Sequence, residues 1–174
     1  MKNIVLKGNY ISWPPLIRVT KKLDHIITFN ESCIYDLGDP VEQYDFFKVI
    51  GLKPNYFSPR KNSAMLAGRW NKEKDRLELT PYFHNEEGDK IFDETFLYTM
   101  SREEVENEKS MRVTIYPERG GLSVTMSDID VHPESQFKMW NIMKTSKWYW
   151  VINLWFGGTL PAPHKITINY KKIK

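Results

Sequence analysis

Short runs that alternate between apolar and polar residues recur along the whole chain, and turn-forming residues separate them. Alternation with a period of two predicts half-buried β-strands, and strands without intervening helical patterns predict antiparallel pairing. The two clearest runs, 63–70 and 76–83, flank the charged loop 71–75 and predict a hairpin. The other predicted strands are 16–20, 22–29, 32–37, 44–52, 95–100, 111–116, 122–126, 147–156 and 164–170. The pattern therefore predicts an all-β, antiparallel β-sandwich.

Two segments interrupt this pattern. Ser101 and Glu104 have the spacing of a capping box, in which the two residues satisfy each other's backbone N–H groups, so we expect a short helical turn there. The run 137–143 is compatible with either a helix or a strand. The sequence thus allows at most one or two short helices.

Length and composition limit the class of protein. A chain of 174 residues is the size of one domain, so we expect residues 1–174 to share one core. Hydrophobic residues make up 41%, which is ample for that core and excludes an intrinsically disordered chain. A net charge of +3 is too small to indicate nucleic acid or a membrane surface as a partner. Cys33 is the single cysteine, which excludes an intrachain disulfide.

Export and membrane signals are weak. The first residues contain only three consecutive apolar positions, whereas a secretory signal needs ~7–15. The most apolar stretch, 148–156, has nine residues, whereas a membrane-spanning helix needs ~20. We expect neither a signal peptide nor a membrane span.

The predicted hairpin has a register that can be deduced from its residues. If Leu79 faces the core, Glu78 and Tyr82 share the opposite face. The loop length allows Arg69 to pair with Glu78, which would place Met65 opposite Tyr82.

That opposite face is a candidate glycan-binding surface. Small Ala67 leaves room for a ligand, Tyr82 offers an aromatic platform, and Arg69, Glu78 and His84 offer directional hydrogen bonds. The alternative is an ordinary solvent-exposed face with a cross-strand ion pair of little energetic value.

The run 148–156 is apolar on both faces of an extended strand. One set of alternating residues must face the core, and we assign the other set, especially Tyr149 and Trp155, to a candidate interface with another subunit. A stacking surface for sugars or bases would also explain these aromatics. Burial of both sets in the core is a further alternative.

Asp128, Asp130 and His132 alternate and would share one face of a strand. They could then hold a hard cation or act as acid and base. Pro133 and the aspartates are also typical of loops, so a solvated loop is the competing interpretation.

The sequence gives no positive support for catalysis or for a cofactor. The histidines, at positions 25, 84, 132 and 164, are not within metal-ligand spacing of one another. Phosphate-binding loops and nucleophile motifs are absent from the sequence. We therefore expect a protein that is not an enzyme and needs no metal or cofactor.

Three segments carry a family resemblance: 62–70, 77–84 and the Phe-Gly-Gly to Ala-Pro-His segment 156–164. Together they resemble an uncharacterised family of concanavalin-like jelly-roll β-sandwiches from gut bacteria and their tailed phages. The resemblance implies a jelly-roll topology, with the last segment leading into the final strand. It implies no catalytic residues.

The resemblance and the missing export signal favour a structural protein of a phage virion, such as an auxiliary (decoration) capsid protein. Its partners would be other subunits of a large assembly, and its location would be the virion or, alternatively, the cytoplasm. The first alternative is a carbohydrate-binding module that uses Arg69, Glu78, Tyr82 and His84. A polysaccharide lyase or hydrolase is the third hypothesis, and it would need a catalytic constellation that the sequence does not supply.

Overall fold

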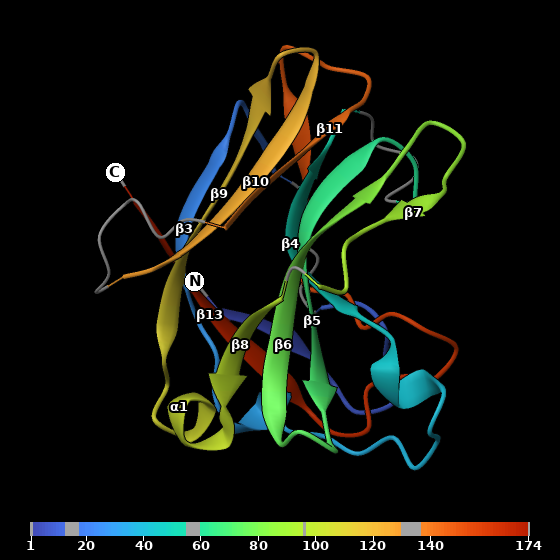
Figure 1. Ribbon diagram of the computed structural model, residues 1–174, viewed down its shortest axis with the longest axis vertical. Coiled ribbons are helices and arrows are strands. Elements are labelled where there is room, and N and C mark those ends of the chain that lie inside the picture. Colours follow the sequence, from blue (N-terminus) through green and yellow to red (C-terminus); the bar gives the residue numbers. More distant parts are fainter. Residues whose placement is uncertain (1, 13–17, 55–59, 96, 130–136, 174) are drawn as a thin grey trace.

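The computed structural model describes residues 2–12, 18–54, 60–95, 97–129 and 137–173. Two antiparallel sheets lie against each other as two layers (Figure 1). The first sheet has the strand order β1 (Lys2–Val5), β13 (Ile166–Lys172), β3 (Leu23–Thr28), β9 (Ser110–Glu118), β10 (Gly121–Asp128) and β11 (Phe137–Ile142). The second sheet has the order β2 (Val19–Thr20), β12 (Tyr149–Ile152), β4 (Phe47–Lys53), β5 (Ser63–Asn71), β6 (Arg76–His84) and β7 (Lys90–Ile91), and β8 (Tyr98–Ser101) also pairs with β6.

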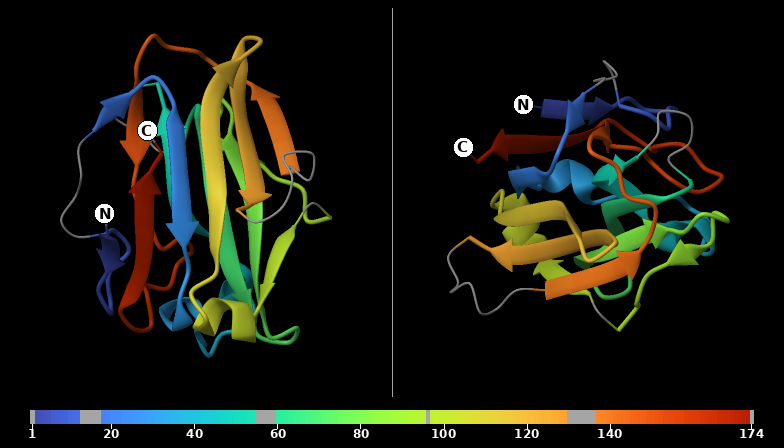
Figure 2. Two further views of the ribbon diagram at one scale, coloured as in Figure 1. Left: turned by 90° about the vertical axis from the view of Figure 1, so that its left-hand side faces the viewer. Right: turned by 90° about the horizontal axis from the view of Figure 1, so that it is seen from above.

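The chain crosses repeatedly between the two sheets, and its first and last strands, β1 and β13, pair with each other. Figure 2 shows the first sheet from its outer side in the left panel, and the stacking of the two layers from above in the right panel. The predicted all-β, antiparallel β-sandwich with at most one or two short helices is confirmed.

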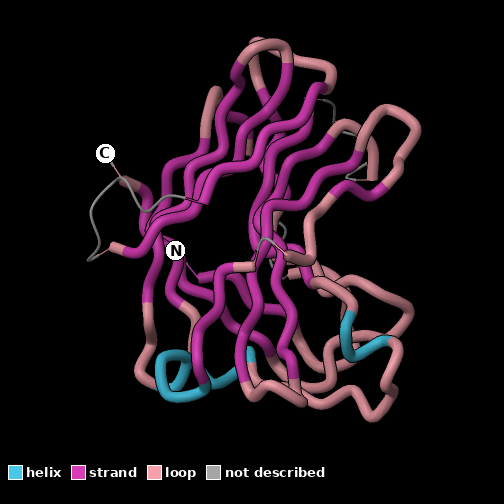
Figure 3. Tube along the Cα trace, viewed as in Figure 1, coloured by secondary structure: helices cyan, strands magenta, loops and turns pink. Residues whose placement is uncertain are grey.

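Helical structure is confined to one end of the sandwich (Figure 3). The helix α1 (Arg102–Glu106) begins at the predicted capping box, where Ser101 Oγ accepts from Glu104 N at 3.2 Å and Ser101 N donates to Glu104 Oε2 at 2.7 Å. Two 3-10 turns, η1 (Glu31–Cys33) and η2 (Glu42–Tyr44), complete the helical segments of the described residues.

Some predicted elements differ from the structure. The expected strand 32–37 is absent, because the Asn30 side chain caps η1 by accepting from Ser32 N. The ambiguous run 137–143 is largely the edge strand β11. The run 147–156 is a strand only over β12, and extended pairing resumes at Trp155 as isolated bridges to Ile11 and Lys48.

The main core lies between the sheets. Residues of the second sheet alternate, so that Leu66, Leu77 and Leu79 face this core while their neighbours face outward. A second, smaller cluster forms on the outer face of the second sheet, with Tyr82 at its centre. This outer face carries the candidate site.

Candidate functional site

The hairpin β5–β6 has the predicted register. Arg69 pairs with Glu78, Ala67 with Thr80, and Met65 with Tyr82 across the two strands. Arg69 Nε donates to Glu78 Oε2 at 2.9 Å, so the expected cross-strand ion pair is also present.

The hypothesis of an ordinary solvent-exposed face is wrong. Arg69 is 7% exposed, Tyr82 2% and Glu78 0%. Phe46, which follows η2, belongs to the cluster around Tyr82, and Phe92 from the segment after β7 packs against it. The sequence did not predict that Phe46 and Phe92 pack over this face, because neither residue belongs to the hairpin and Phe92 lies in a segment without a clear hydrophobic pattern.

Glu78 is the anchor of a polar network. One carboxylate oxygen accepts from Arg69, and the other accepts from Asn71 Nδ2 at 3.0 Å and from Arg76 Nη2 at 2.8 Å. Burial alone would raise the pKa of Glu78, but the hydrogen bonds from Arg76 and Arg69 outweigh it and the pKa is lowered. Glu78 is therefore an ionised group that fixes Arg69 in place.

Tyr82 does not offer the open aromatic platform that the sequence suggested. The ring of Phe92 stacks on it with centroids 5.1 Å apart, and Lys48 Nζ lies 4.3 Å from its centroid. Burial raises the pKa of Tyr82, and the nearby carboxylate of Asp45 adds to this effect. His84 contacts the Tyr82 ring at 5.3 Å. Tyr82 thus forms part of the wall rather than a free stacking surface.

A cavity of about 540 Å³, called here the charged cavity, lies on this face. It brings together three of the four residues predicted for glycan binding, Arg69, Tyr82 and His84, whereas Glu78 is not part of its lining. Its lining includes Lys48, Arg69, Tyr82, His84, Lys90 and Trp155. In Figure 1 the hairpin between β6 and β7 extends away from the sheet body on this side.

Lys48 of β4 is the residue at this site that sequence reasoning missed. Lys48 is only 7% exposed, and its Nζ donates to the Phe46 carbonyl oxygen at 2.6 Å. Burial lowers the pKa of Lys48 to about 8, and the neighbouring Lys90 adds to this effect. A signal was present, because Lys48 interrupts the otherwise apolar run 46–50.

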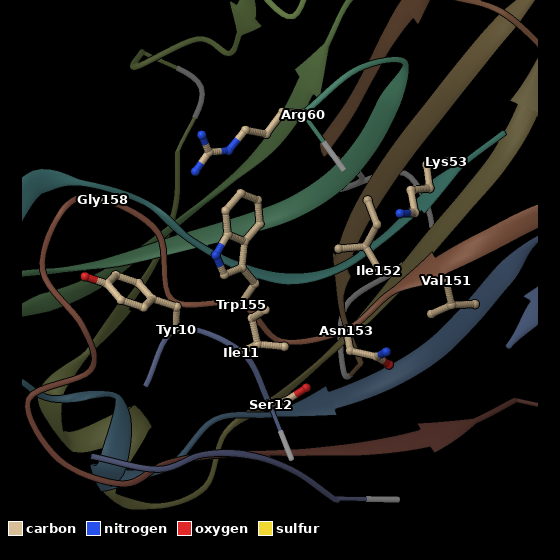
Figure 4. Close-up of a pocket in the computed structure, with 10 residues that line it drawn as sticks. All are labelled: Tyr10, Ile11, Ser12, Lys53, Arg60, Val151, Ile152, Asn153, Trp155 and Gly158. Atoms are coloured by element: carbon tan, nitrogen blue, oxygen red, sulfur yellow. The ribbon is translucent and has the colours of Figure 1, made fainter. Parts of the chain in front are cut away.

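Trp155 lines the charged cavity and also a second, neighbouring cavity of about 550 Å³, called here the apolar cavity. Figure 4 shows the Trp155 indole in the middle of this second cavity, with Tyr10 and Ile11 on one side and Arg60 on another. The Arg60 guanidinium lies 5.4 Å from the indole centroid. Trp155 is partly exposed and so presents ring surface to both cavities.

The prediction that Tyr149 and Trp155 share one face is wrong. Tyr149 is fully buried in the main core, and its hydroxyl accepts from Ser146 N at 3.0 Å. The alternation changes phase after β12, because Leu154 rather than Asn153 returns to the core. Tyr149 is therefore not available as an interface residue, whereas Trp155 lies on the cavity side.

The acidic motif at the end of β10 is only partly within the described residues. Asp128 closes the strand, accepts from Tyr98 Oη at 3.1 Å and pairs with Lys109 Nζ at 3.1 Å. Asp130 and His132 lie outside the described residues. Within the described ranges, no group of three or more His, Cys, Asp or Glu side chains could hold a metal ion.

The fold and the site define an all-β sandwich with a partly charged, partly aromatic cavity on the outer face of one sheet. No family model matches the chain, and no curated protein sequence matches it. Among the helices of the described residues, none is long and apolar enough to cross a membrane.

Proposed function

We propose that this protein is a carbohydrate-binding β-sandwich module whose ligand occupies the charged cavity. The observation that carries this proposal is the convergence of a partly exposed indole, Trp155, with Lys48, Arg69 and His84 in one cavity of about 540 Å³. A volume of this size lies within the range of small-ligand cavities.

The chemistry of the cavity suits a sugar. Trp155 offers an apolar ring surface to the C–H face of a pyranose, and its polar neighbours can bond hydroxyl groups. Arg69 and Lys48 keep N–H donors beyond those bonded within the described residues, since Arg69 has five and Lys48 has three. These donors are pre-positioned by the Glu78 network and by burial, which reduces the entropy cost of binding.

We favour binding over turnover because Glu78, the buried carboxylate of the polar network, is fully engaged. Glu78 is held ionised by three donor residues and lacks the raised pKa of a general acid.

The experiment is a glycan-array screen followed by calorimetric titration of the saccharides that bind. Trp155→Ala should weaken binding by ~10-fold or more, as expected when a stacking surface worth roughly 1.5 kcal/mol is lost. Trp148→Ala is the matched control, because Trp148 is 49% exposed and does not line the cavity. Equal affinity of the two variants, or no binding across a broad panel, would contradict the proposal.

A second candidate function is a subunit of a phage virion, such as an auxiliary capsid protein. It is favoured by β11, the terminal strand of the first sheet, which presents Trp140 at 39% and Ile142 at 69% exposure. Mass measurement by light scattering tests it: a defined oligomer that Ile142→Lys dissociates supports assembly through this edge. A monomer at high concentration that also fails to bind virions contradicts it.

A further inference from the structure

Lys48 lies at an irregularity of its strand. The pairing of β4 with β5 shifts between Lys48 and Ile50, so Val49 is the extra residue of a β-bulge. Bulges redirect neighbouring side chains and are common beside functional sites. Here Lys48 lies opposite Ala67 on the cavity side of the sheet, where the small alanine leaves room for its long side chain.

The Lys48 ammonium is buried without a carboxylate partner. Its contacts are the Phe46 carbonyl at 2.6 Å, the Tyr82 ring at 4.3 Å and the Trp155 ring at 5.8 Å. Among the described residues, no carboxylate lies within 4.0 Å of Nζ. Buried lysines are almost always paired, so an ammonium in this position lacks an expected counter-ion.

The other charges of the cavity do not compensate for Lys48. Lys90 and Arg60 add positive charge near it, and Asp45 is the carboxylate that opposes them. The remaining charged residues of the lining, Arg69 and Glu94, pair with each other at 3.4 Å. The cavity therefore has an excess of positive charge centred on Lys48.

Gly157 fixes the space beside the ammonium. A Cβ atom at this position would lie 2.6 Å from the Phe46 carbonyl oxygen and 3.2 Å from Lys48 Nζ. The glycine thus allows the backbone to approach closely while Lys48 still borders the cavity.

We propose that the ligand of the charged cavity is an acidic saccharide, whose carboxylate, sulfate or phosphate group binds the Lys48 ammonium while a sugar ring lies against Trp155. This inference rests on the proposed function and adds the ligand class. The ligand anion supplies the missing counter-ion, and the low polarity of the buried position strengthens the resulting charge-assisted hydrogen bond. The aromatic neighbours at 4.3 and 5.8 Å limit hydration of the ammonium and so favour an anion over water.

The test is calorimetric titration with uronate-containing, sulfated and phosphorylated oligosaccharides, each paired with a neutral counterpart such as its methyl ester or its unmodified form. Wild-type protein should bind at least one acidic ligand ~10-fold or more tightly than its neutral counterpart. Lys48→Met should abolish that preference, so that the acidic ligand and its neutral counterpart bind the variant with equal affinity. Comparison of the three acidic series identifies which anion the site takes.

Lys171→Met is the matched control, because Lys171 is an exposed lysine of β13 in the other sheet. It should retain the preference for acidic ligands. Equal binding of acidic and neutral members of every pair by wild-type protein overturns the inference without relying on any variant. Equal affinity of Lys48→Met and wild type for the acidic ligand also overturns it. Absence of binding to all saccharides is a different outcome, which overturns the proposed function itself.

Discussion

Replacement of Lys48 by methionine should change how stability depends on pH. In the folded protein burial lowers the pKa of Lys48 to about 8 from its ordinary 10.5, so folding disfavours the charged amine by about 3 kcal/mol at pH 7. Methionine at this position makes neither the hydrogen bond to Phe46 nor the cation contact with the Tyr82 ring, and each loss costs the variant about 1 kcal/mol. We therefore expect Lys48→Met to be about 1 kcal/mol more stable than wild type at pH 7.

The sign of the pH effect follows from proton binding. Between pH 8 and pH 10.5 the Lys48 amine is mostly protonated in the unfolded chain and mostly neutral in the folded protein. The free-energy cost of burying the charged amine is therefore largest below pH 8 and decreases as pH rises. The penalty should shrink by about 1 kcal/mol between pH 7 and pH 9. Wild type and Lys48→Met should then have nearly equal stability at pH 9.

Urea unfolding of both proteins at pH 7, 8 and 9 measures this difference, and subtraction removes the contributions of other titrating groups such as Cys33. Lys171→Met should show a constant difference from wild type over the same range. A stability difference between Lys48→Met and wild type that stays constant with pH would show that Lys48 is solvated like a surface lysine, contrary to this prediction.

Three further predictions concern stability. Burial lowers the pKa of His25 to about 4 from 6.5, so protonation of His25 should reduce stability by on the order of 2 kcal/mol as pH falls from 6.5 to 4. Unfolding titrations of His25→Leu should show that most of this decline is gone. Glu78→Gln should destabilise the protein by about 3 kcal/mol in urea unfolding, because it leaves two guanidinium groups without their carboxylate. The free energy of unfolding of the exposed control Glu86→Gln should stay within about 0.5 kcal/mol of wild type. Gly157→Ala should cost about 1–3 kcal/mol in thermal unfolding, since the added Cβ meets the Phe46 carbonyl at 2.6 Å, and a neutral effect would show that this contact relaxes freely.

The hairpin β5–β6 could be predicted from the sequence down to its register. Its alternation is unbroken on both strands, and the pair Arg69–Glu78 allows one pairing that also places Leu79 in the core. The burial of its outer face could not be predicted, because Phe92 reaches it from a loop segment that has no period of its own. The alternation of residues within two strands determines their register, whereas burial of their outer face depends on segments elsewhere in the chain.

The run 147–156 shows the opposite case. Its continuous apolar character concealed a change of phase after β12, so Tyr149 and Trp155 lie on different sides of the sheet. Alternation cannot locate such a shift when both faces of a strand are apolar, because every register then fits equally well. Lys48 was missed for a related reason, since one charged residue in an apolar run reads as a solvated position unless the fold is known.

An acidic saccharide in the charged cavity should lie against the Trp155 ring. The most direct measurement is a nuclear magnetic resonance titration that follows the six tryptophan indole N–H signals, assigned by single substitutions, as the best acidic ligand of the calorimetric panel is added. We expect the Trp155 signal to shift in a saturable way and the Trp140 and Trp148 signals to stay in place. In Lys48→Met the same shift should need a ~10-fold or higher ligand concentration. A saturable shift at Trp140 or Trp148 with an unchanged Trp155 signal would contradict this expectation, because the ligand would then bind outside the charged cavity.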